Sequence, residues 1–259
     1  PNCAADGTKY AAGTRVQLTA KPAGGYSFAF WSGDAGGSAN PTTVTMGGIS
    51  GLATHPTEPG TAYVLFSFAT RPKILRTTDF GATWTDLSGF AGGSPSTNGF
   101  PDVAVYDLQV FSDDPNRLWA GTEIGLVESL DGGQTWEQVL YVGTTTGCVD
   151  LIMRPDQPDV VLAAMWERLR TPERYDYGGP NCAVWKTTDG GDTWDIVGGG
   201  LPTPNSNDGR IGLAICQNQP DRMYAVYADR IGYFDGLYRS DDGGVFWSRV
   251  NDGALSNLF

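Results

Sequence analysis

The sequence has few of the side chains that serve histidine- or thiol-based chemistry. It contains a single histidine, His55, which excludes histidine-rich zinc sites by count and gives little support to a Ser-His-Asp or Cys-His arrangement. The four cysteines follow no metal-type spacing such as C-x-x-C; they are Cys3, Cys148, Cys182 and Cys216. One or two disulfides in an oxidising compartment and buried free thiols both fit these cysteines.

Basic residues are also scarce. Lysine and arginine total 17 against 29 aspartates and glutamates, so the formal net charge is −12. Such a surface repels phosphate backbones and anionic lipid, so neither nucleic acid nor membrane is a predicted partner. No apolar run approaches the roughly 20 residues that span a bilayer. No signal peptide precedes Pro1, so we expect that a leader was removed or that the chain starts internally.

Glycine, proline and tryptophan are plentiful, and one eight-residue pattern occurs four times. The chain has 36 glycines, 16 prolines and 8 tryptophans, a composition that suits an all-β fold with many turns. The pattern has a hydroxyl residue, then Asp, Gly and Trp at fixed positions, and occupies residues 77–84, 129–136, 187–194 and 240–247. Its aspartates are 52, 58 and 53 residues apart. A period of this length indicates a repeat architecture.

Each copy lies within a longer frame that predicts four strands. An apolar strand is followed by a proline turn, a second strand, a connection, a third strand, the eight-residue turn and a fourth strand. That is one blade of a β-propeller. We therefore predict an all-β chain, with a small β module at residues 1–48 and four visible four-stranded blades at 49–259. A larger propeller, of which these blades are a part, is the alternative.

The recurring aspartates are predicted to be structural. Each can accept hydrogen bonds from the N–H groups of its own turn, glycine supplies a positive φ, the hydroxyl can bond across the hairpin, and the tryptophan is expected between neighbouring blades. Four equivalent copies cannot line one active centre. Phe80 and Phe246 replace the usual glycine and threonine in two copies. The structural set is Asp79, Gly81, Trp84, Asp131, Gly133, Trp136, Asp189, Gly191, Trp194, Asp242, Gly244 and Trp247.

The pattern S/T-x-D-x-G-x-x-W resembles the Asp box of bacterial neuraminidase (BNR) repeats. Longer stretches over about residues 49–259 resemble the bacterial sortilin-like propeller family; they are 139–153, 163–168, 178–180, 185–188, 209–214 and 237–252. The resemblance implies either a receptor for peptides and proteins or a glycosyl-hydrolase-like chain. The two-propeller xyloglucan-cleaving hydrolases share such blades and hold their acid and base in a cleft between the propellers. No residue here matches that pair.

The first 48 residues differ from the rest. Residues 10–20 alternate between apolar and polar, as in a half-buried strand, and the segments 22–28, 31–34 and 40–46 follow. Together they resemble the internalin B-type repeat of bacterial surface proteins. That resemblance implies an extracellular spacer or adhesive module.

The longest connection within a blade, residues 167–181, is the candidate ligand site, because long loops on a rigid scaffold often carry recognition. Its candidate contacts are Arg168, Arg170, Arg174, Tyr175 and Tyr177. The alternative is a solvated loop whose arginines pair with Glu167, Glu173 and Asp176.

Other polar segments are weaker candidates for a functional site. His55 is expected to be structural, and residues 201–210 to form a surface loop between blades. No cofactor and no metal site is predicted, although calcium at the acidic turns 113–114 or 241–242 is an alternative to simple solvation.

The predicted function is an extracellular binding or scaffold module that engages a protein or glycan through blade loops. The first alternative is a glycoside-hydrolase-like enzyme acting on polysaccharide, with cleft carboxylates supplied partly by further sequence. The second is a structural subunit that assembles with other surface proteins. We expect a secreted or cell-surface location, or the periplasm, and a chain that is a segment of a longer one.

Overall fold

The computed structural model of the protein describes residues 15–19, 42–45, 48–67, 72–90, 95–170 and 175–250. Every regular element in these ranges is a β-strand. None of the ranges contains a helix long and apolar enough to cross a membrane.

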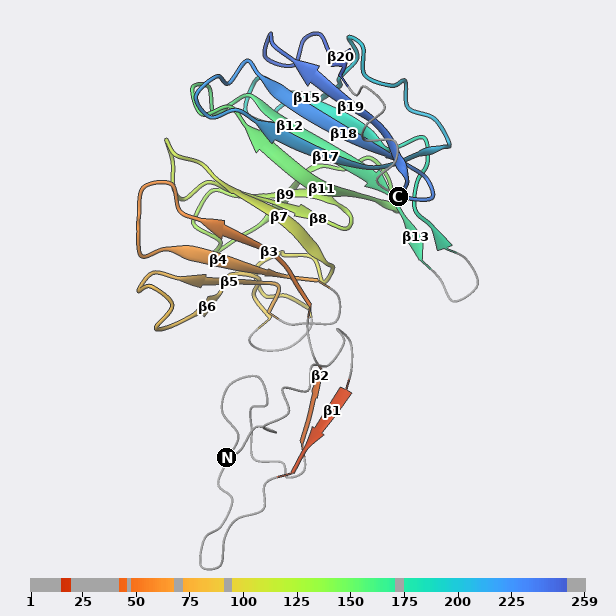
Figure 1. Ribbon diagram of the computed structural model, residues 1–259. Helices are drawn as coiled ribbons and strands as arrows, with labels where there is room; N and C mark the ends of the chain where they lie inside the picture. The colour runs from red at the N-terminus through yellow and green to blue at the C-terminus, as the bar shows by residue number, and fades with distance from the viewer. Residues whose placement is uncertain are drawn as a thin grey trace, which may run out of the picture.

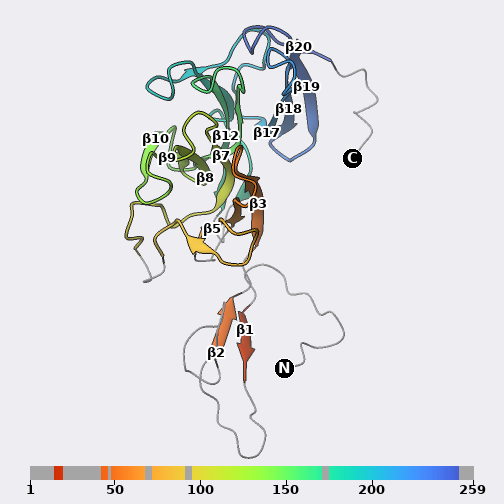
Figure 2. The same ribbon diagram turned by 90° about the vertical axis from the view of Figure 1, so that its left-hand side faces the viewer.

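Four antiparallel four-stranded sheets follow one another along the chain and stand side by side in space (Figures 1 and 2). We call them blades 1 to 4, and together they form part of a β-propeller. Blade 1 is β3 (Ile49–Thr54), β4 (Ala62–Phe66), β5 (Ile74–Thr77) and β6 (Thr85–Asp86). Blade 2 is β7 (Val105–Val110), β8 (Leu118–Thr122), β9 (Gly125–Ser129) and β10 (Glu137–Leu140).

Blades 3 and 4 have the same order. Blade 3 is β11 (Thr146–Met153), β12 (Val161–Glu167), β15 (Ala183–Thr187) and β16 (Asp195–Ile196), with the short hairpin β13 (Leu169–Arg170) and β14 (Tyr175–Asp176) inserted after β12. Blade 4 is β17 (Asp208–Ile215), β18 (Met223–Asp229), β19 (Phe234–Ser240) and β20 (Ser248–Arg249). The predicted loop 201–210 therefore ends earlier, because Asp208 to Arg210 already belong to β17.

A separate two-stranded sheet precedes the blades. It pairs β1 (Arg15–Leu18) with β2 (Thr42–Thr45) in antiparallel register, Arg15 opposite Thr45. Figures 1 and 2 place it apart from the blades. Most of the predicted module at residues 1–48 lies outside the described residues, so its boundary stays a prediction.

Inner strands of the middle blades are buried on both faces. Along β12, Val161, Ala163 and Met165 pack toward blade 2, whereas Leu162 and Ala164 pack toward blade 4. Successive side chains of a strand point to opposite faces, so a sheet with a neighbour on each side needs an unbroken apolar run. This explains why β8 and β12, the second strands of blades 2 and 3, lack the alternating burial of a half-buried strand, whereas β4 and β18 of the end blades show it.

Two half-buried aspartates join the first strands of neighbouring blades. Asp107, at a bulge in β7, accepts the N–H of Leu108 and that of Leu151 in blade 3, both at 2.8 Å. Asp150 does the same one blade later, accepting from Leu151 at 3.0 Å and from Leu213 at 2.7 Å. Burial raises the pKa of both carboxyl groups. Each carboxylate thus holds two adjacent inner strands in register.

The eight-residue turns, which we call Asp-box turns, are closed by their aspartates. Asp131 Oδ1 accepts the N–H groups of Gln134 at 2.9 Å and Thr135 at 2.8 Å, and Oδ2 accepts the Thr135 hydroxyl at 2.6 Å. These bonds favour the ionised form, and they lower the pKa of Asp131 and of Asp189 to about 2. The corresponding pKa values of Asp79 and Asp242 are lowered as well.

The sequence suggested that the hydroxyl residue of each Asp-box turn bonds across the hairpin. In the structure its hydrogen bonds lie within the turn instead. Ser129 donates to Asp131 Oδ1 at 2.8 Å and accepts the N–H of Gly133 at 2.8 Å. The turn curls back over the hydroxyl, so that partners within the turn are nearer than the opposite strand. The second glycine has a positive φ in all four turns, for example 91° at Gly133. At the preceding position Phe80 has φ 58° where the other turns have glycine.

The Asp-box tryptophans of blades 2, 3 and 4 face the preceding blade. Trp136 donates its Nε1–H to the carbonyl of Leu87 in blade 1 at 2.9 Å, Trp194 lies 5.5 Å from Trp119 of blade 2, and Trp247 packs into the core between blades 3 and 4. Trp136 and Trp247 are 4% and 1% exposed, whereas Trp84 of blade 1 is 42% exposed. The position is therefore an interface position, and Trp84 has no preceding blade among the described residues.

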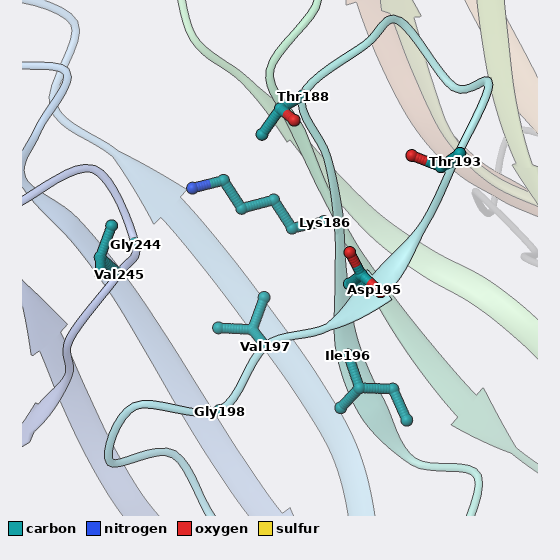
Figure 3. A pocket seen from close by; sticks show the side chains of 9 residues that line it. All are labelled: Lys186, Thr188, Thr193, Asp195, Ile196, Val197, Gly198, Gly244 and Val245. Carbon is teal, nitrogen blue, oxygen red and sulfur yellow. The ribbon is translucent and has the colours of Figure 1, made fainter.

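A cation from each blade also reaches the Asp-box turn of the next. Arg76 donates to the carbonyl of Gly132 at 3.3 Å, and Lys186 donates to that of Gly243 at 2.8 Å. Figure 3 shows the Lys186 side chain pointing toward the blade 4 turn across a small hollow between the two blades.

In blade 2, the cation that contacts the Asp-box turn of the next blade comes from a different position. Glu128 occupies the position of Arg76 and Lys186, and it accepts a hydrogen bond from Arg117 Nε at 2.8 Å. Arg117 in turn donates to the carbonyl of Gly190 in blade 3. The acidic residue at this position is therefore compensated by an arginine that directly precedes the neighbouring strand β8.

Candidate functional site

The connections of each blade divide between two ends. The proline turn, which joins the first two strands of a blade, and the Asp-box turn, which joins the last two, lie at the same end. In blade 1, Ala62 follows the proline turn and pairs with Thr77, where the Asp-box turn begins. The other end, which we call the hairpin end, carries the connections β4–β5, β8–β9, β12–β15 and β18–β19. The first strands β7, β11 and β17 begin there, opposite Thr122, Glu167 and Asp229. Side chains from three blades can therefore meet at the hairpin end.

An ion pair between two blades lies at this end. Glu123 stands in the β8–β9 turn, where its N–H donates to the carbonyl of Ala104 at 3.0 Å. Arg168 follows β12 in blade 3 and donates its Nη2 to Glu123 Oε1. The arginine side chain is 10% exposed and the glutamate 33%, so a half-exposed carboxylate rests on a buried guanidinium. Such charge-assisted bonds fix the position of the carboxylate.

Aromatic rings lie beside the arginine of this pair. The Arg168 guanidinium carbon lies 5.1 Å from the ring centre of Trp166 and 5.8 Å from that of Tyr106. Arg210 of blade 4 lies 5.8 Å from the same Trp166 ring. These distances are in the range of cation–π attraction. Burial raises the pKa of Tyr106 to about 12, so its phenol stays protonated and can donate a hydrogen bond.

The inserted hairpin contributes a further aromatic ring. Tyr177 stacks on Trp166 with ring centres 6.3 Å apart and planes at 20°, and its carbonyl accepts the Trp166 Nε1–H at 2.6 Å. We call Tyr106, Glu123, Trp166, Arg168, Tyr177 and Arg210 the hairpin-end cluster. It joins rings, guanidinium groups and one carboxylate from blades 2, 3 and 4.

A cavity of about 290 Å³ lies beside the inserted hairpin. Its lining includes Glu167, Asp176, Gly178 and Arg230, and Arg230 of blade 4 pairs with Asp176. A Cβ at Gly178 would stand 2.2 Å from the carbonyl of Asp208, so the hairpin meets blade 4 too closely for any side chain there. The inserted hairpin is thus anchored to blade 4.

The structure brings together two of the five predicted ligand contacts, Arg168 and Tyr177. Arg170 and Tyr175 pair as backbone partners in the inserted hairpin; their side chains and Arg174 lie outside the described residues. Arg168 pairs with Glu123 of blade 2, a partner that the alternative prediction of ion pairs within the loop did not include. Sequence reasoning missed Tyr106, Glu123, Trp166 and Arg210, which lie 42 to 62 residues from Arg168 or beside it in the strand. Their only shared signal is a position at the ends of inner strands.

Other candidate residues lie elsewhere or are engaged. His55 Nδ1 accepts the N–H of Glu58 at 3.0 Å in a proline turn, at the end opposite the cluster. Cys148, Cys182 and Cys216 are free thiols, and burial raises the pKa of Cys182 to about 11, which keeps that thiol protonated. Cys3 lies outside the described residues.

The acidic turns considered for calcium are occupied by protein groups. Asp241 accepts hydrogen bonds from Arg222 at 2.7 Å and from Arg239 at 2.8 Å, and Asp114 accepts the N–H of Asn116 at 3.0 Å. Within the described ranges no group of three or more His, Cys, Asp or Glu residues could hold a metal ion.

Part of the chain matches a known family model, and most of it is similar to proteins named xyloglucanases. The Divergent InlB B-repeat domain matches residues 3–54. The xyloglucanase Xgh74A of Acetivibrio thermocellus is 28% identical over 209 residues, which are 73% of this chain and 24% of that protein. A xyloglucanase of Paenibacillus sp is 26% identical over 232 residues, 82% of this chain and 21% of that protein. The chain thus spans about a quarter of these relatives.

Solved structures show the same fold. An ancestral GH74 enzyme superposes with a TM-score of 0.62 at 19% identity, covering 80% of this chain and 25% of that one. The GH74 xyloglucanase of Xanthomonas campestris gives 0.58 at 19% identity, covering 80% and 30%. These likenesses show a β-propeller fold. The sortilin-like assignment stays a prediction.

Proposed function

We propose that this chain forms the polysaccharide-binding part of a glycoside-hydrolase-like propeller and that the hairpin-end cluster is its binding surface. The observation that carries the proposal is the guanidinium of Arg168, which lies over the rings of Tyr106 and Trp166 and holds the carboxylate of Glu123. The similarity to two xyloglucanases supports a polysaccharide as the ligand.

The chemistry of the cluster suits a sugar chain. Aromatic rings offer flat apolar surface with polar rims, and glutamate, arginine and a protonated phenol supply acceptors and donors for hydroxyl groups. Hydrolysis of a glycosidic bond requires a pair of carboxyl groups. Glu123 is the carboxylate that the cluster presents, and we propose that the second comes from another part of the whole protein.

Binding is tested with xyloglucan by affinity electrophoresis and calorimetry. Trp166→Ala and Tyr177→Ala should each weaken binding about tenfold or more, equivalent to about 1.4 kcal/mol. Tyr177 is 39% exposed, so its replacement spares the fold. Phe246→Ala is the matched control, because Phe246 is 59% exposed at the opposite end. Unchanged affinity in both cluster variants would refute the proposed surface.

Cleavage is tested in the whole protein by the release of reducing ends from xyloglucan. The variant Glu123→Gln, in blade 2, is compared with the control Glu58→Gln, which lies in the proline turn at the opposite end of blade 1. Turnover lost in the Glu123 variant alone supports hydrolysis. Binding without turnover in the whole wild-type protein would overturn the hydrolytic half and leave the binding module that the loops suggested.

A secreted or cell-surface location belongs to the same proposal. It is supported by the match of residues 3–54 to a B-repeat domain and by the resemblance of that module to bacterial surface repeats.

A further inference from the structure

We propose that the cavity beside the inserted hairpin binds a single neutral sugar unit, at a site separate from the hairpin-end cluster. The cavity measures about 290 Å³, and its polar side chains are Thr145, Glu167, Asp176, Ser206 and Arg230. None of these side chains belongs to the hairpin-end cluster. The inference therefore goes beyond the proposed function and does not rest on it.

The cavity lies at the junction of blades 3 and 4. Thr145 stands directly before β11, and Glu167 ends β12. Ser206 lies in the connection that leads to β17, and Arg230 directly follows β18. The inserted hairpin supplies Asp176. Polar groups from separate segments of the chain therefore converge on one space, as they do in small-molecule sites.

Backbone contacts hold the walls of this cavity in place. The N–H of Gly179 donates to the carbonyl of Asp208 at 2.9 Å, and that of Arg230 donates to the carbonyl of Asn207 at 2.7 Å. A Cβ at Gly179 would overlap the carboxylate of Glu167, so the glycine allows the inserted hairpin to approach this side chain. A site that is already formed loses little conformational entropy when a ligand binds.

Glu167 and Arg230 keep hydrogen-bonding groups that the protein leaves available. Glu167 Oε2 accepts the N–H of Asn181 at 3.1 Å, and no lysine or arginine of the described residues pairs with this half-buried carboxylate. Arg230 pairs with Asp176 through Nη2, and its other guanidinium N–H groups have no acceptor among the described residues. The lining thus offers both acceptors and donors to a ligand.

The charges of the lining select a neutral ligand. Arg230 and Asp176 balance each other, so Glu167 leaves an excess negative charge in the cavity. A carboxylate on the ligand would be repelled, whereas a hydroxyl group donates and accepts at once and suits a mixed lining. Small-molecule pockets measure about 300–1,000 Å³, and a cavity at the lower limit suits one sugar ring better than a chain.

The site is tested by NMR titration of the full chain with D-glucose and with D-glucuronate, in which a carboxylate replaces the CH₂OH group. Glucose should bind in the millimolar range, and glucuronate at least about tenfold more weakly. A wild-type chain that binds no glucose, or binds glucuronate as tightly, would overturn the proposal.

Two variants place the sugar in the cavity. Ser206→Phe introduces a ring from an exposed position of the lining and should abolish glucose binding. Its matched control is Thr203→Phe, because Thr203 is exposed in the same connection but does not line the cavity. Glu167→Gln removes the excess charge and should bring the two affinities within about threefold of each other. Glucose binding that survives in Ser206→Phe, or unchanged discrimination in Glu167→Gln, would contradict the site.

Tyr177→Ala separates this site from the proposed function. The Tyr177 ring does not line the cavity, so the variant should weaken xyloglucan binding and leave glucose binding unchanged. Loss of glucose binding in this variant would overturn the inference, because it would place the sugar on the rings of the hairpin-end cluster. Glucose binding in a chain that does not bind xyloglucan would refute the proposed function alone.

Discussion

The contrast between Trp136 and Trp84 allows the energy of a blade junction to be measured at equivalent positions. Trp136 is 4% exposed, its Nε1–H bonds to Leu87, and its ring meets Phe100 edge-on at 5.0 Å. Trp136→Ala should lower the free energy of unfolding by about 3–5 kcal/mol, as for a large aromatic residue removed from a core. Trp84 keeps 42% of its surface in water, so Trp84→Ala should cost about 1–2 kcal/mol.

Urea unfolding followed by circular dichroism measures both losses. Thermal unfolding gives a second measure, with about 2–4 °C expected for each kcal/mol in a chain of this size. Equal losses for the two variants, within about 0.5 kcal/mol, would refute the assignment of this position to the junction with the preceding blade.

Two further predictions concern single turns. Phe80→Gly should raise the stability by about 1 kcal/mol in urea unfolding, because φ is 58° there and a left-handed backbone is costly for a side-chain-bearing residue; a loss would contradict this. The pKa of Asp131 and of Asp189 is lowered to about 2 in the folded chain, so their stabilisation is present above about pH 4 and is lost toward pH 2. The double variant Asp131→Asn, Asp189→Asn should lose less stability over this window than the wild type, and an unchanged pH profile would contradict the role of these turns. Asp107 and Asp150 act with the opposite sign, since burial raises the pKa of each carboxyl group.

The fold followed from local patterns in the sequence. Each four-stranded blade is encoded by a contiguous unit with its own proline turn and Asp-box turn, and the strands pair in sequence order. The pattern also predicted tryptophans at the interfaces between blades. It did not reveal that Trp84 would be half exposed, because exposure depends on the neighbour of a blade and not on its own sequence.

The hairpin-end cluster was only partly accessible from the sequence. The length of the 167–181 connection pointed to Arg168 and Tyr177. Glu123 and Arg210 could not be found in this way, because they approach Arg168 and Trp166 only when separate blades pack side by side. Contacts between repeats carry no local signal when each repeat contributes one residue.

The aspartates that bridge the first strands also bear on how such repeats vary in length. Asp107 and Asp150 each bind the backbone of two adjacent blades, so an insertion in an inner strand would break both attachments. Additional residues can enter only where no such bridge exists. Blade 3 carries its extra segment in the β12–β15 connection, which leaves the inner strands undisturbed and adds new surface beside the aromatic rings.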